Sequence, residues 1–135
     1  MAENIRLEVV TPEKSVVSEN AQIVMAPGSL GEFGVLAGHT PFLTTLKTGA
    51  LKYKDEGGSE RLLFISSGFA EALPDRVTVL AESAERRRDI DIQRAKAAAE
   101  RAEQRMQSGA EDVDFVRAKA ALMRAISRIQ LAESR

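Results

Sequence analysis

The feature that most constrains the fold is a pair of alanine-rich segments at the end of the chain, separated by Ser108-Gly109. Apolar residues in the first segment recur at a heptad-like spacing, which places them along one side of a helix: Ile92, Ala95, Ala99, Ala102 and Met106. The second segment repeats the spacing with Phe115, Ala118, Leu122, Ala125, Ile129 and Ala132. Two such seams joined by a short turn predict an antiparallel helical hairpin.

The ends of both helices are marked by residues that cap helices. Asp89 is predicted to be the first N-cap, and Asp91 lies in the first turn, where a carboxylate complements the helix dipole. Ser108-Gly109 ends the first helix, and Asp112 is predicted to cap the second. Because alanine buries little area, at ~25 cal/mol per Å² the contact between the helices is weak, and the hairpin is expected to open or move.

The residues before the hairpin form short runs of alternating apolar and polar residues, separated by turn residues. Strands are predicted at residues 5–9, 42–46, 50–54, 62–66, 69–73 and 76–81, and residues 15–18 and 21–25 together form a further extended stretch. Residues 28–41 contain four glycines and are interpreted as a dense turn region. Seven or eight such strands predict an antiparallel sandwich or flattened barrel. The fold class is therefore α+β in sequence order, with a β-domain at residues 1–84 and a helical hairpin at 85–135.

Composition excludes several classes of protein. The chain has no cysteine, so disulfides, thiolate metal sites and cysteine nucleophiles are absent. A formal net charge of -1 gives no reason to expect nucleic acid or anionic lipid as a partner. No run of about 18 apolar residues is present, and the N-terminus lacks the regions of a signal peptide, so we expect a cytoplasm-like compartment. Residues 85–135 carry 12 basic and 9 acidic side chains, whereas residues 1–84 carry 7 and 11.

The arginines of the two helices have the same spacing. Their offsets of 7 and 11 put them in one cationic stripe on each helix: Arg94, Arg101 and Arg105, then Arg117, Arg124 and Arg128. One interpretation is an anion site, such as one for a polyphosphate, where the stripes converge. The other is a solvated helix face whose charge is balanced by Glu100, Glu103, Glu111 and Asp114.

No enzyme site is apparent. Gly28, Gly31 and Gly34 match neither the dinucleotide fingerprint nor the phosphate-binding loop of NTPases. His39 is the only histidine and has no cysteine nearby, so a loop residue that hydrogen-bonds the backbone is favoured over a metal ligand or a catalytic base. A glycine-stiffened loop with Glu32 and His39 suits a protein contact. We expect a chain that is not an enzyme and binds no metal.

These residues carry a resemblance to a known family. The run GEFGVLAGHTPF at residues 31–42 resembles the G-E-[LF]-G-[IV]-L-P-G-H-x-P-L loop of the epsilon subunit of bacterial F-type ATP synthase. Ser67-Gly68-Phe69 and residues 77–81 (VTVLA) resemble two further segments of that family, and the order of domains matches over the whole chain. Ala37 stands where the family usually has proline, and Ser67 where it usually has glycine.

The resemblance implies a non-catalytic rotor subunit of the central stalk, which couples gamma to the c-ring in proton-driven ATP synthesis. Glu32 matches the family's c-ring contact, and His39 lies in its gamma-facing region. The helical pair is implied to permit turnover when folded. When extended along gamma, it is implied to reach the alpha and beta catalytic subunits and inhibit ATP hydrolysis. The chain would then be peripheral at the cytoplasmic face of the bacterial plasma membrane, which it meets only through the complex.

The resemblance also implies ATP as a regulatory ligand, with no cofactor required. Some family members hold the folded hairpin with ATP at an [IL]-D-x-x-R-A motif, which is matched by residues 90–95. The implied ATP contacts are Glu85, Ile90, Asp91, Arg94, Ala95, Arg124 and Arg128. Two alternatives remain: a stand-alone nucleotide-binding module, and an adaptor with a coiled-coil arm.

Overall fold

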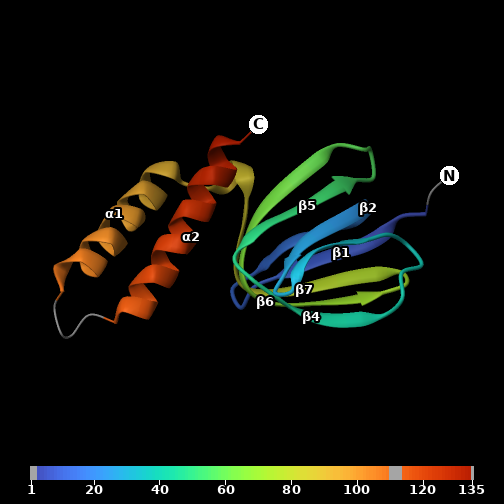
Figure 1. The fold of residues 1–135 in the computed structure, drawn as a ribbon. Coiled ribbons are helices and arrows are strands. Elements are labelled where there is room, and N and C mark those ends of the chain that lie inside the picture. Colours follow the sequence, from blue (N-terminus) through green and yellow to red (C-terminus); the bar gives the residue numbers. More distant parts are fainter. Residues whose placement is uncertain (1–2, 110–113, 135) are drawn as a thin grey trace. The chain divides into compact units, whose positions relative to one another are not determined.

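The computed structural model describes residues 3–109 and 114–134, and the chain divides into two compact units, Met1–Arg87 and Arg88–Arg135. Within the described residues the first unit holds seven strands and the second both α-helices, which confirms the predicted fold class (Figure 1). The predicted domain boundary lies between residues 84 and 85, with the charged run from Glu85 opening the helical part. The last strand instead continues through Arg86, and the units divide after Arg87.

The strands pair into one closed sheet. They are β1 (Ile5–Val10), β2 (Ser15–Gly28), β3 (Gly31–Val35), β4 (Phe42–Leu46), β5 (Gly49–Asp55), β6 (Glu60–Leu73) and β7 (Arg76–Arg86). β1 pairs with both β2 and β7, and β5 joins β2 to β6, so the sheet closes on itself as a flattened barrel. One pairing departs from the predicted antiparallel pattern, because β1 runs parallel to β7, with Leu7 opposite Val77.

Alternation explains most of the strands and the core that they enclose. In β1, Ile5, Leu7 and Val9 are fully buried, while Arg6 points outward. The largest side chain with less than 2% exposure is that of Tyr53, which lies among aliphatic residues of the other strands. The core therefore lies inside the closed sheet.

Two predictions about the strands were wrong. Residues 31–35, interpreted as part of a turn region, form β3, which pairs with β2 from Gly31 opposite Gly28 to Val35 opposite Val24. Residues 62–66 and 69–73, predicted as two strands, belong to the single strand β6. Ser67 and Gly68 have positive φ angles of 60° and 139°, yet the register with β7 is kept from Ser66 to Gly68. The chain therefore bends at this point without leaving the sheet.

The helical unit contains α1 (Ile92–Ser108) and α2 (Phe115–Glu133), preceded by a short 3-10 turn, η1 (Arg87–Asp89). The predicted N-cap Asp89 lies in η1, and the cap is Asp91, whose carboxylate accepts a hydrogen bond from Arg94 N. Gly109 ends α1 in the left-handed conformation, as predicted. The N-cap of α2 is Asp114, and Asp112, predicted for that role, lies outside the described residues.

The predicted seam is confirmed at its centre and differs at both ends of α2. Ala95 and Ala102 of α1 and Ala118 and Ala125 of α2 are buried, and the two helices pack against each other side by side (Figure 1). Phe115, by contrast, is 54% exposed, and Leu131 is buried although it was not predicted. A straight helix has 3.6 residues per turn, so its buried side drifts away from a strict heptad over five turns.

The left-handed conformation at residue 67 gives a first prediction. Ser67 is exposed and carries a Cβ at a φ of 60°, where the resembled family has glycine. Replacing it by glycine removes the conformational strain and loses no packing, so Ser67→Gly is expected to stabilise the chain by about 0.5–1 kcal/mol. The measurement is the free energy of unfolding in urea. Ser67→Ala, which keeps the Cβ, is the control, and an equal gain in that variant would contradict the explanation.

Candidate functional site

The residues implied for ATP fall on both units. Glu85 lies in β7 of the first unit, and the other six belong to the second. Arg94 is in the first turn of α1, while Arg124 is at the middle of α2 and Arg128 is in its second half. Because α1 and α2 run antiparallel, Arg94 and Arg128 lie toward the same end of the hairpin (Figure 1). The helical part of the implied site therefore belongs to one unit.

Three residues of the I-D-x-x-R-A motif have structural roles. Ile90 is buried, Asp91 caps α1 with its side chain, and Ala95 is only 4% exposed in the seam. Arg94 differs from these, because its side chain is exposed and its backbone N–H alone takes part in the cap. Within the motif, Arg94 is therefore the residue whose side chain is neither buried nor used to cap α1.

The two arginine stripes differ in exposure. Arg94, Arg101, Arg105 and Arg117 are exposed, whereas Arg124 and Arg128 are partly buried. Over its 19 residues α2 holds four basic side chains and a single acidic one, Glu133. In the interpretation of a solvated helix face, Glu100 and Glu103 balance the charge of the arginines. Both are exposed on α1. Of the other two acids, Asp114 is engaged as the N-cap of α2, and Glu111 lies outside the described residues.

The loop that contains His39 is ordered by its own backbone and an aromatic contact. His39 Nδ1 lies 2.7 Å from the carbonyl oxygen of Thr40, so this nitrogen is placed to donate a hydrogen bond. The imidazole also meets the ring of Phe42 at a centroid distance of 5.1 Å. These contacts agree with the interpretation of His39 as a loop residue that hydrogen-bonds the backbone. Among the described residues, no group of three or more metal-ligating side chains could hold a metal ion.

Glu32 and the turn beside His39 complete the predicted partner loop. Glu32 is exposed in β3, opposite Pro27 of β2. Residues 36–39 form a β-turn, in which the N–H of His39 donates to the carbonyl of Leu36 at 3.2 Å and Gly38 has a φ of 84°. Positive φ at the third position is typical of a type II turn, whose second position, here Ala37, favours proline. This explains why proline is usual there in the resembled family.

An apolar groove on the first unit was not predicted from the sequence. It measures about 270 Å³ and is lined by Leu43, Phe69, Glu71, Thr78 and Leu80. Leu43 is 70% exposed, and Phe69 and Leu80 are about half exposed. Phe69 lies opposite Thr45 on one side and Leu80 on the other, so the groove crosses β4, β6 and β7. Residues 79–81 are all apolar and so break the alternation of the strand. This pattern is the feature of the sequence that indicates an apolar outer face.

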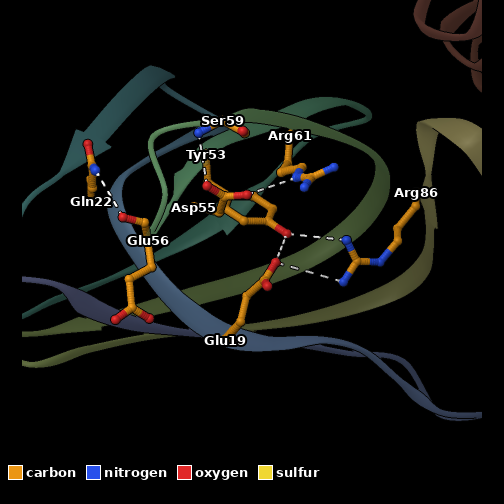
Figure 2. A network of polar contacts seen from close by, with 8 residues as sticks. All are labelled: Glu19, Gln22, Tyr53, Asp55, Glu56, Ser59, Arg61 and Arg86. Carbon is orange, nitrogen blue, oxygen red and sulfur yellow. Dashed lines mark hydrogen bonds and ion pairs between the residues drawn. The ribbon is translucent and has the colours of Figure 1, made fainter.

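A network of polar contacts joins β2, β5 and β7 (Figure 2). The hydroxyl of Tyr53 donates to the carboxylate of Glu19, and Arg86 donates to the Tyr53 oxygen at 3.3 Å. Arg86 also pairs with Glu19 at 3.9 Å. Burial, and next the hydrogen bond to Glu19, raise the pKa of Tyr53 above its ordinary value.

The neighbouring β5–β6 hairpin has a separate set of contacts. The carboxylate of Asp55 accepts a hydrogen bond from Ser59 N at 2.9 Å and one from Arg61 Nε at 3.1 Å (Figure 2). The bond from Ser59 is the main reason why the pKa of Asp55 is lowered. Gln22 donates to the carbonyl of Glu56 at 3.3 Å and ties the turn to β2.

The raised pKa of Tyr53 predicts a pH dependence of stability. The folded state holds the phenolic proton more tightly than the unfolded state, so the stabilisation is complete below the unfolded pKa of about 10 and is lost as pH rises above it. The chain has one tyrosine and no tryptophan, so phenolate absorbance reports this residue alone. We expect the folded chain to titrate at higher pH than the chain in urea. Coincident titrations would contradict the predicted shift.

Comparisons with known proteins agree on one family. The model described as ATP synthase, Delta/Epsilon chain, beta-sandwich domain matches residues 4–87, and the one for the long alpha-helix domain matches residues 88–133. The ATP synthase epsilon chain of Desulfosudis oleivorans is 75% identical over 109 residues, which are 81% of this chain and 82% of that relative. That of Desulfatibacillum aliphaticivorans is 68% identical over 135 residues, 100% of this chain and 96% of the relative.

Solved structures give the same result. A chain in the cryo-EM structure of Euglena gracilis mitochondrial ATP synthase, OSCP/F1/c-ring in rotational state 1, superposes with a TM-score of 0.79 at 28% identity. The match covers 92% of this chain and 78% of that one. Over the described residues, neither helix is long and apolar enough to cross a membrane.

Proposed function

The chain belongs to the ATP synthase delta/epsilon chain family as a non-catalytic epsilon subunit of the central stalk, and from this premise we propose how its two units act. The β unit docks on the gamma subunit and, through the loop with Glu32, on the c-ring. The helical unit regulates ATP hydrolysis and responds to ATP. The chain meets the cytoplasmic face of the bacterial plasma membrane only through the complex.

The observation that carries the docking proposal is the apolar groove of the β unit. The neighbouring side chains of Leu43, Phe69 and Leu80 expose apolar surface to water. Such exposure does not stabilise an isolated soluble domain. Covering such a surface with a partner removes it from water, and full burial of a Phe or Leu side chain contributes about 1.5–3 kcal/mol. The groove therefore suits a stable contact within the rotor.

The docking proposal is tested with one position of the groove. Phe69→Asp is expected to weaken binding to purified gamma by about tenfold or more, because the partner would have to desolvate a carboxylate. Phe69→Leu is the matched control, since it keeps an apolar side chain, and it should bind within about threefold of the parent. Equal affinities for Phe69→Asp and the parent would exclude the groove from the gamma contact.

The nucleotide proposal rests on the cationic end of the hairpin. Arg94 is exposed at the start of α1, Arg128 lies toward the same end of the hairpin on α2, and Arg124 lies at the middle of α2, so phosphates could meet arginines from both helices. ATP would then favour the folded hairpin by its differential affinity for the two states. The extended hairpin would offer the same arginines to acidic surfaces of the alpha and beta subunits, so ATP and inhibition would compete for one set of charges.

Calorimetric titration of the whole chain with ATP tests this proposal. Binding should be lost or weakened at least tenfold in Arg94→Ala and in Arg124→Ala, as expected for charge-assisted bonds to phosphate. Arg105→Ala is the control, because Arg105 lies in the same stripe but in the last turn of α1. No heat at millimolar nucleotide, or equal losses in all three variants, would reject a specific ATP site.

A further inference from the structure

Three side chains from three strands meet at the end of β7. Glu19 comes from β2, Tyr53 from β5 and Arg86 from β7, and Figure 2 shows them pointing toward one another. None of them lines the apolar groove or belongs to the implied ATP site. Arg86 is the last residue of β7, and the second unit begins two residues later at Arg88. The cluster thus lies where the chain leaves the sandwich.

The end of β7 pairs with fewer strands than its beginning does. Its last two pairs with β6 are Phe64 opposite Glu85 and Leu63 opposite Arg86, and terminal pairs of a ladder open most easily. The other neighbour of β7 is β1, whose pairing reaches only Leu80. From Ala81 onward β7 therefore has a partner strand on one side only.

The three-residue cluster supplies a second attachment. Neither β2 nor β5 pairs with β7, so the bonds of Arg86 to Tyr53 and Glu19 reach strands outside its own ladder. Tyr53 is a firm anchor, because the residue is only 1% exposed and its hydroxyl donates a hydrogen bond to Glu19. The side chain of Arg86 is 24% exposed, and a partly buried charge-assisted hydrogen bond is stronger than an exposed one.

We propose that Glu19, Tyr53 and Arg86 form a clamp that holds the end of β7 and thereby sets the length of the connection to the helical unit. With the clamp closed, the connection begins at Arg87. With it open, β7 separates from β6 as far as Ala84, whose side chain is 7% exposed and belongs to the core, and the connection gains Glu85 and Arg86. A longer connection allows the helical unit a wider range of positions. The clamp requires neither ATP nor a partner subunit, so it stands independently of the proposed function.

Hydrogen exchange of the whole chain tests the clamp. Tyr53→Phe removes the hydroxyl and keeps the buried ring, and it should accelerate exchange of the protected amides among residues 63–64 and 85–86 by about tenfold, the factor that a typical lost hydrogen bond gives. Arg61→Gln is the matched control. It breaks the Arg61–Asp55 pair on the neighbouring hairpin and should leave exchange at the end of β7 unchanged.

Two more variants separate the clamp from general loosening. Glu19→Gln and Arg86→Gln should accelerate the same amides, while exchange in the first part of β7 stays as in the parent. The phenol of Tyr53 should respond in opposite directions: its pKa falls in Glu19→Gln and rises further in Arg86→Gln. Unchanged exchange at residues 85–86 in all three clamp variants, or equal acceleration in Arg61→Gln, would overturn the proposal.

Discussion

Gly68→Ala is expected to destabilise the β unit by about 4 kcal/mol or more, enough to prevent folding in many domains of this size. A Cβ at this position would stand 2.0 Å from the carbonyl oxygen of Leu80 and 2.9 Å from Cα of Ala81, both in the backbone of β7. Backbone atoms inside a paired sheet cannot move aside as a flexible side chain can. Urea denaturation followed by circular dichroism gives the free energy of unfolding, or soluble yield where the variant fails to fold.

Gly31→Ala separates this clash from the strain of the backbone angle. Gly31 has a φ of 136°, nearly the 139° of Gly68, but apart from its own chain neighbours no heavy atom lies within 4 Å of the position of its Cβ. It should therefore lose only the conformational part, about 1–3 kcal/mol. If both variants lost the same stability, the close approach of β6 to β7 at Gly68 would not be the cause.

The second large effect is expected in the helical unit, where Ala102→Leu should separate α1 from α2. Ala102 is 2% exposed in the seam, and the larger side chain has no room there, so overpacking costs about 1–3 kcal/mol. The alanine seam provides little stabilisation to offset this cost. Hydrogen exchange should show amides throughout both helices exchanging faster, while the β unit exchanges as before.

Ala97→Leu is the matched control for that change. Ala97 lies on the exposed side of α1, and leucine forms helix nearly as well as alanine, so this variant should behave like the parent. Equal exchange in Ala102→Leu and Ala97→Leu would show that the seam tolerates a larger residue, and the weak-contact explanation of hairpin opening would be wrong.

The sequence predicted well what depends on local periodicity. Strand β1 alternates buried and outward residues, and the seam alanines recur at a helical spacing, so both were found. Strand β3 was missed because four glycines within residues 28–41 suggested turns, whereas a glycine can also pair in a ladder when its neighbour strand is close. The division of β6 into two strands arose for the same reason, at Ser67 and Gly68.

The sites were predictable only where a motif marked them. Residues 90–95 were singled out by resemblance, yet which residue of the motif caps the helix depended on where α1 begins, and the cap moved from Asp89 to Asp91. The contacts of Tyr53 with Glu19 and Arg86 bridge residues more than 30 positions apart. Such contacts depend on how the sheet closes rather than on a local pattern, so no residue spacing in the sequence predicts them.

The parallel pairing of β1 with β7 has a consequence for how the chain is made. The first strand to leave the ribosome finds its second partner only after the last strand has been synthesised, so closure of the sandwich must wait for nearly the whole β unit. The helical hairpin has no such delay, because α1 and α2 are neighbours in the chain and pack on each other. During synthesis the β unit can therefore close only after its last strand has emerged, whereas the hairpin needs only α1 and the α2 that follows it.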